Sequence, residues 1–132
     1  MNGFDTNIEK QTLENSNFRK VLHTSEFQQL VVMSIPVDGE IGQEVHDEND
    51  QFIRVESGEA EATIDGRKIT LGDDDVIIIP KGAEHNVVNT SADKDLKLYT
   101  IYSPPHHKDG TVHATKAEAD ADDEHFDGVT SE

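Results

Sequence analysis

Short β-type segments recur along residues 18–102, and no helical period interrupts them. Roughly nine such segments follow one another at spacings of about 8–12 residues, with turn-forming residues between them. Asp65-Gly66 separates two of them, 60–64 and 67–71, and favours a hairpin, because both central residues of a type I′ turn need positive φ. Many short strands at this spacing are typical of an all-β sandwich or barrel. We expect the following residues in its core: Ile53, Val55, Ile64, Leu71, Ile77, Ile79, Val87 and Leu98.

The chain of 132 residues has room for one domain, since domains usually contain about 100–200 residues. Three regions differ in composition. Residues 1–27 are a polar N-terminal arm with a first strand, residues 28–102 are the barrel, and residues 103–132 are a connector containing Pro and His with an acidic tail. Thr115-Lys116-Ala117-Glu118 fits a capping box, which predicts a short C-terminal helix.

The composition restricts the partners of the protein. There are 11 Lys and Arg against 28 Asp and Glu, so the formal net charge is −17, which argues against binding to nucleic acid or to a membrane surface. The chain has no cysteine, and therefore no disulfide or thiolate metal site. No apolar run approaches the ~18 residues of a membrane helix, so we expect a soluble, cytoplasmic protein. The acid excess fits either adaptation to high salt or an ordinary acidic protein with an acidic tail.

Four residues have side chains that could hold a metal ion. Glu44 and His46 are two positions apart, so on a strand they point to the same face. Gln51 begins the next predicted strand after a tight loop, and His85 follows the turn at 80–84. Two imidazoles, a carboxylate and an amide oxygen form a plausible site for a divalent transition metal. Gln51 either coordinates through its oxygen or only hydrogen-bonds a ligand, and the alternative for the histidines is an ordinary surface role.

Two sequence motifs resemble those of the cupins. The segment Pro80-Lys81-Gly82-Ala83-Glu84-His85-Asn86-Val87-Val88-Asn89 is similar to the second cupin motif, P-x-G-x-x-H-x-x-x-N, at every defined position. The segment 42–58 resembles the first motif, G-x5-H-x-H-x3–4-E-x6-G, in altered form. Glu44 stands at the first His, His46 matches the second, and Gln51 replaces the Glu. The resemblance covers roughly residues 28–102 and is closest to small single-domain cupins of the group labelled mannose-6-phosphate isomerase-like.

The resemblance implies an antiparallel jelly-roll barrel with a metal ion at its open end. By the family pattern the metal ligands are His46, Gln51 and His85, with Glu44 in a substituted position. A Gln at the Glu position also occurs in cupins similar to those that linearise unsaturated uronates. Mn, Fe, Ni or Zn would suit such a ligand set. Cupin barrels usually pair, so the resemblance also implies a homodimer.

Two further residues are candidates for catalysis. Period-2 alternation on the last strand turns Tyr102 inward, either as a phenol near the metal or as part of the packing. His106 lies in the connector after Pro104-Pro105. The connector is either a plain polar segment or folds across the open end of the barrel, where His106 could shuttle a proton or contact substrate.

These features support three functions for the protein. The first is a Lewis-acid enzyme that isomerises, ring-opens or eliminates from a small polar metabolite such as a sugar or sugar acid. The second is a non-haem metal dioxygenase, which the Gln and Glu exchanges make less favourable. The third is a non-catalytic small-molecule binding module. Phosphorylated substrates fit less well, because the motif region supplies few cations, namely Lys81 and either Arg54 or Lys108.

Overall fold

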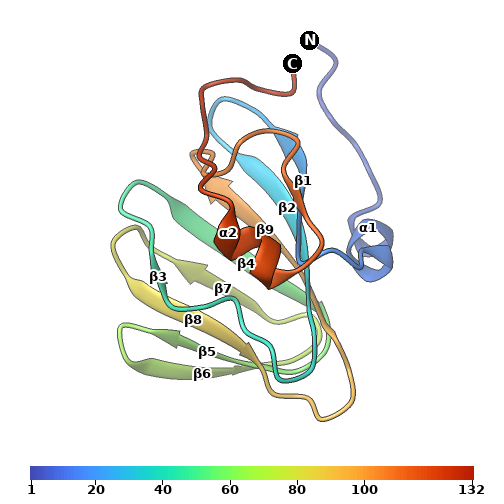
Figure 1. Cartoon of the computed structure of the whole chain (residues 1–132), viewed down its shortest axis with the longest axis vertical. Helices are drawn as coiled ribbons and strands as arrows, with labels where there is room; N and C mark the ends of the chain where they lie inside the picture. Colours follow the sequence, from blue (N-terminus) through green and yellow to red (C-terminus); the bar gives the residue numbers. More distant parts are fainter.

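The computed structural model describes all 132 residues and shows two antiparallel sheets packed face to face (Figure 1). The six-stranded sheet has the order β10 (Val112–His113), β1 (Arg19–Thr24), β2 (Gln29–Ile35), β9 (Leu96–Ser103), β4 (Asp50–Ser57) and β7 (Val76–Ile79). The four-stranded sheet has the order β3 (Glu44–Val45), β8 (Glu84–Asn89), β5 (Ala60–Ile64) and β6 (Arg67–Leu71). This architecture confirms the all-β jelly-roll that the sequence predicts.

Two glycines show how local sequence sets the chain path. Between β5 and β6, Asp65 has φ 47° and Gly66 has φ 82°, as the predicted hairpin turn requires. Gly58 follows β4 with φ 122°, and a Cβ there would lie 3.1 Å from the Cα of Leu96. A larger residue at position 58 would therefore meet both backbone strain and a clash.

A single core of 19 buried hydrophobic residues lies between the two sheets. Of the eight predicted core residues, all except Ile64 are buried, and Ile64 is half-buried against the same core. The apolar run of β7 alternates in burial: Ile77 and Ile79 face inward, while Ile78 is 65% exposed. β7 lies at the sheet edge and packs on one face only, so its unbroken hydrophobicity does not indicate burial on both faces.

Helix α1 (Ile8–Glu14) lies on the six-stranded sheet and contacts β2, β4 and β9. The polar composition of the N-terminal arm did not predict this helix. It begins at Asn7, whose side chain accepts a hydrogen bond from the Lys10 N–H at 2.9 Å. Thr12 is fully buried within it. A cap and a packed face therefore stabilise seven residues that would be too short to form a helix alone.

Helix α2 (Lys116–Ala121) is the predicted C-terminal helix. The Thr115 hydroxyl accepts a hydrogen bond from the Glu118 N–H at 3.2 Å. The Glu118 carboxylate in turn accepts one from the Ala114 N–H at 2.8 Å, one residue before the position that a capping box would use. The capping sequence at Thr115–Glu118 therefore marks the N-terminal end of α2, as predicted.

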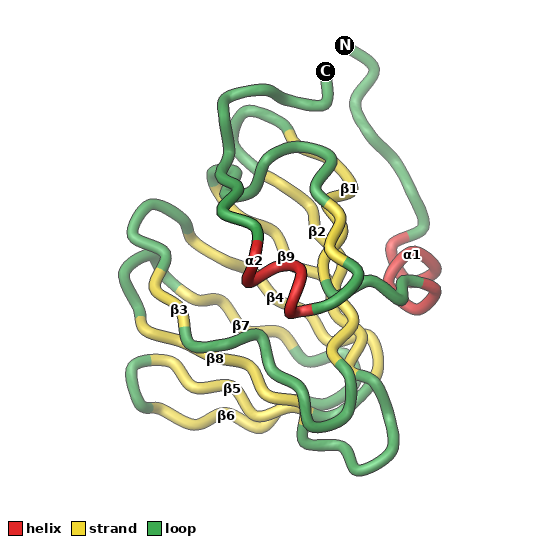
Figure 2. The backbone as a smooth tube through the Cα atoms, viewed as in Figure 1, coloured by secondary structure: helices red, strands yellow, loops and turns green.

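The last part of the chain folds back over the barrel. Figure 2 shows α2 between β3 and the sheet edge that carries β1, and shows the two chain termini side by side. The N–H groups of Asn2 and Gly3 donate to the Glu132 carboxylate at 3.1 and 3.0 Å. No helix in the structure has the length and apolarity that crossing a membrane requires.

Candidate metal centre

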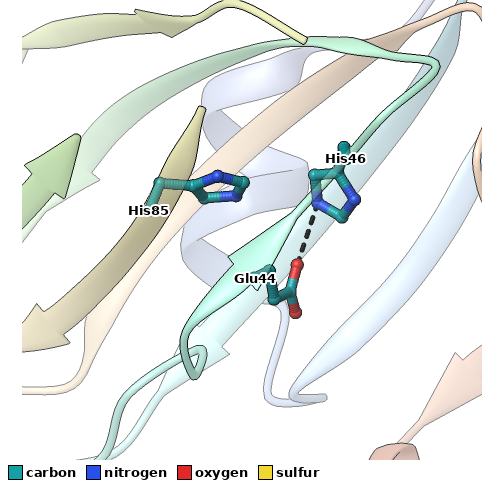
Figure 3. Close-up of side chains that lie close together, drawn as sticks. All are labelled: Glu44, His46 and His85. Atoms are coloured by element: carbon teal, nitrogen blue, oxygen red, sulfur yellow. Dashed lines mark ion pairs between the residues drawn. The ribbon is translucent and has the colours of Figure 1, made fainter. Parts of the chain in front are cut away.

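Glu44, His46 and His85 come together at one end of the barrel, which we call the barrel mouth (Figure 3). One ligand atom from each residue lies within 4.8 Å of those from the other two. Glu44 on β3 is the register partner of His85 on β8, and His46 follows Glu44 by two positions. Antiparallel pairing of these two strands thus joins the two motifs into one site.

The imidazole of His85 is held in one orientation. Its Nδ1 lies 2.9 Å from the carbonyl oxygen of Ala83. Because a carbonyl oxygen only accepts hydrogen bonds, Nδ1 carries the proton and Nε2 keeps its lone pair for a metal. The turn before His85 is tied to the other ligand segment, since the Gly82 N–H donates to the His46 carbonyl at 2.8 Å.

His46 and Glu44 approach closely without forming an aligned hydrogen bond. The His46 Nε2 lies 2.9 Å from the Glu44 Oε2, yet this buried nitrogen has no hydrogen-bond partner. Burial alone would raise the pKa of Glu44, but its contact with His46 and the charges of His46, Arg19 and His85 bring that pKa below its usual value. Glu44 is therefore an anionic carboxylate at neutral pH, close enough to share an ion with His46.

Gln51 is buried on β4 of the six-stranded sheet, whereas Glu44 and His85 lie on strands of the four-stranded sheet. Its register partner on β9 is Tyr102, whose ring lies 5.6 Å from that of His46. The Gln51 Nε2 donates to the Thr100 hydroxyl at 3.1 Å, which fixes the amide. Its Oε1 is buried and accepts no hydrogen bond.

Two buried polar atoms of the predicted ligands form no hydrogen bond, the Gln51 Oε1 and the His46 Nε2, although the latter lies 2.9 Å from the Glu44 carboxylate. Leaving a buried polar group unpartnered costs about 1–3 kcal/mol. An imidazole nitrogen, an amide oxygen and a carboxylate together suit a divalent transition metal such as Mn, Fe, Ni or Zn. Glu44, His46 and His85 could therefore hold a metal ion, whereas coordination by Gln51 stays a prediction.

The connector after β9 folds across the barrel mouth. The ring centroid of His106 lies 4.3 Å from that of His46 and 5.3 Å from that of Tyr102. Of the two arrangements that the sequence allows for this segment, the structure shows the one that covers the site. Burial and the charges of His107 and His46 lower the pKa of His106 to about 4, so its ring is neutral at neutral pH. Its catalytic role stays a prediction, as does that of Tyr102.

A second set of buried polar side chains holds this cover in place. The His107 Nδ1 lies 2.6 Å from the Glu124 Oε1, and its Nε2 lies 3.3 Å from the Tyr102 hydroxyl. Burial would raise the pKa of Glu124, but hydrogen bonds from His107 and the Lys108 N–H lower it to about 2. Burial also raises the pKa of Tyr102 beyond its usual range, so the phenol stays protonated and donates to His107.

Sequence reasoning did not find three residues at the barrel mouth. In the sequence, His107 belongs to the connector and Glu124 to the acidic tail, and no motif marks Arg19. All three lie on the wall of one cavity with Glu44 and His46. The sequence contains two adjacent histidines in the connector and an acidic run in the tail. Their spacing along the chain does not show that the two segments contact each other.

Comparison with known proteins supports this description. The cupin family model, described as "Cupin domain", matches residues 31–102. Protein YrkC of Bacillus subtilis is 42% identical over 122 residues, which are 88% of this chain and 65% of YrkC, so the chain spans about two thirds of that relative's length. The crystal structure of BH2720 from Bacillus halodurans shares 45% identity with a TM-score of 0.87 and covers 90% of this chain and 94% of that one.

More distant structures share the fold alone. KdgF from Halomonas sp. is 22% identical with a TM-score of 0.62, and the match covers 69% of this chain and 79% of that one. The family match spans more than half of the chain and includes His46, Gln51 and His85, so this protein belongs to the cupin family.

Proposed function

We propose that this cupin is a metal-dependent enzyme that isomerises, ring-opens or eliminates from a small polar metabolite such as a sugar or sugar acid. The observation that carries the proposal is the group of Glu44, His46 and His85, whose ligand atoms lie within 4.8 Å of one another, with an ionised Glu44 and an oriented His85. A purely structural cluster would give the buried His46 Nε2 and Gln51 Oε1 hydrogen-bond partners, and neither atom has one.

The metal would be held by His46, His85 and Glu44, with Gln51 as a further oxygen ligand. A bound divalent ion would polarise a carbonyl or hydroxyl group of the substrate. The neutral ring of His106, next to His46, has a free lone pair with which to accept a proton. His106 from the connector and Glu124 from the tail line the same cavity as Glu44 and His46.

Metal content tests this proposal directly. We expect protein purified without a metal-affinity tag to contain one divalent transition metal per chain by elemental analysis. The His46→Ala and His85→Ala variants should each lose it, because each removes an imidazole ligand. His23→Ala is the matched control, since His23 stacks on Phe4 away from the barrel mouth. Metal retention in both ligand variants would contradict the proposal.

Turnover separates the enzyme from its alternatives. A bound metabolite converted to an isomer or elimination product supports the Lewis-acid enzyme. Consumption of O₂ would identify a dioxygenase instead, and recovery of an unchanged metabolite would identify a binding module.

Two other expectations from the sequence also stay predictions, a cytoplasmic location and a homodimer. The outer face of the six-stranded sheet carries exposed apolar side chains, among them Ile78 at 65% and Val76 at 44% exposure on β7. A second copy could cover such a face. Light scattering should then give twice the mass of one 14.6 kDa chain, and a monomer mass would contradict the dimer.

A further inference from the structure

Arg19 on β1 is a buried cation without a counter-ion. The residue is 8% exposed, and its guanidinium forms no ion pair. Its Nε is buried and has no hydrogen-bond partner. The only polar contact of the guanidinium joins Nη1 to the Nδ1 of His113 at 3.4 Å. The edge formed by Nε and Nη2 is therefore free of protein partners.

The nearby acids are paired with other residues. The carboxylates of Glu44, Asp122 and Glu124 contact His46, His113 and His107, respectively, at 2.9, 2.9 and 2.6 Å. These acids balance the charge of Arg19 only at longer range.

Burying an ion without a direct partner is destabilising, because the ion loses its hydration. The guanidinium lies over the Phe18 ring, 5.4 Å from its centroid, and this cation–π contact offsets only part of that cost. The position of Arg19 is therefore costly unless a ligand pairs with it.

Arg19 faces the same cavity as the candidate metal centre. This cavity, of about 350 Å³, is lined by Arg19, Glu44, His46 and His106 among others. Ligand cavities commonly range from about 300 to 1,000 Å³, so this one suits a small molecule. A ligand here could contact the guanidinium and the metal ligands at once.

We propose that Arg19 binds the carboxylate of a small organic acid whose other polar group reaches the candidate metal centre. The free Nε and Nη2 edge matches a carboxylate, because two parallel N–H groups can donate to its two oxygens. No lysine and no second arginine line the cavity, and Asp120, Asp122 and Asp123 lie on its rim. A doubly charged phosphate would meet more repulsion there than a carboxylate. The second contact rests on the proposed function, whereas the carboxylate site rests on Arg19 itself.

The test follows the Arg19 Nε–H resonance of the ¹⁵N-labelled full chain by NMR. The chain has three arginines, and the other two are internal controls: Arg54 pairs with Asp74 at 2.8 Å, and Arg67 is exposed. The probes are acetate, its neutral analogue acetamide, and inorganic phosphate, at constant ionic strength. We expect acetate to shift the Arg19 signal saturably, at a concentration about tenfold or more below that of acetamide or phosphate.

Variants and metal content complete the experiment. Arg19→Lys keeps the charge but loses the planar fork, so it should weaken acetate binding about tenfold and leave the metal content unchanged. The proposal is overturned if acetate leaves the Arg19 resonance unmoved, if acetamide acts equally, or if phosphate binds more tightly. Should Arg19→Lys fail to fold, the titration of the unaltered chain decides alone.

Elemental analysis of the same samples separates the two proposals. Metal without an acetate response rejects the role of Arg19, whereas an acetate response without metal rejects the proposed function and keeps the carboxylate site.

Discussion

The buried histidines around the barrel mouth fall into two groups that differ in how their ring nitrogens are used. His46 and His85, from the barrel, each have one nitrogen that forms no hydrogen bond, although the His46 Nε2 lies 2.9 Å from the Glu44 carboxylate. His107 and His113, from the C-terminal region, have both nitrogens in contact with neighbouring side chains. All four are at most 7% exposed, so burial does not distinguish them. An unused lone pair identifies a candidate ligand, and a fully bonded ring identifies a histidine that holds the fold together.

Among the tests of this comparison, metal removal should cause the largest change in stability. A ligand present at about a thousand times its dissociation constant stabilises a protein by about 4 kcal/mol. We expect EDTA to lower the melting temperature of the unaltered protein and to leave that of His85→Ala unchanged, because this variant has no metal to lose. Calorimetry with and without EDTA measures both. An equal shift in the two proteins would place the metal elsewhere.

His107→Ala should have the next largest effect, through the fold and not through the metal. The substitution leaves the Glu124 carboxylate and the buried Tyr102 hydroxyl without their partner. Breaking such a buried pair costs about 3 kcal/mol. Urea unfolding of the metal-free protein should show this loss, while elemental analysis shows metal retained. His107→Gln can still hydrogen-bond one neighbour and should lose less. Loss of the metal in His107→Ala would end the distinction between the two groups.

The pairing of His107 with Glu124 also predicts how stability depends on pH. Burial, followed by the charge of Arg19, lowers the pKa of His107 despite its hydrogen bond to Glu124. The unfolded chain therefore binds a proton at His107 first, and stability declines as the pH falls below about 6.5. The pKa of Glu124 is lowered to about 2, so its contribution is present above about pH 4.3, the unfolded value, and is lost towards pH 2.

Glu124→Gln separates these two pH ranges. The amide oxygen can still accept a hydrogen bond from His107 but has no charge to lose, so the metal-free variant should lose stability less steeply between about pH 4.3 and 2. Urea unfolding across the pH range measures this. Parallel curves for the variant and the unaltered chain below pH 4.3 would show that Glu124 contributes no charge interaction.

The sequence predicts the barrel in detail because its signals are local. The Asp65-Gly66 turn and the strands 60–64 and 67–71 have the predicted positions. Strand alternation, turn residues and the cap of α2 each depend on residues close together in the sequence. These local features account for most of the predicted strands and turns. The two-residue strand β10 has no such signal and helix α1 has only its Asn7 cap, so both depend on contacts with distant segments.

Some residues of the candidate site can likewise be predicted from local sequence, and others cannot. The ligand candidates His46 and His85 lie within motifs, so spacing alone identifies them. His107, Glu124 and Arg19 meet only through folding of the C-terminal segment over the mouth, and no pattern along the chain reports that contact. Long-range contact is what the sequence does not show.

The smallest expected effect concerns His125, which extends the comparison to an exposed histidine. It lies on the wall of the same cavity, but its side chain is 73% exposed and its one ion pair is with the fully exposed Asp123, at 3.2 Å. Surface pairs of this kind contribute about 0–1 kcal/mol. His125→Ala should therefore leave the metal content, the EDTA response and the urea midpoint as they are in the unaltered chain. The same assays on His85→Ala and His107→Ala give the size of effect with which the His125→Ala result is compared. A loss of metal in His125→Ala would show that position in the cavity, and not an unused buried lone pair, decides which histidines bind the ion.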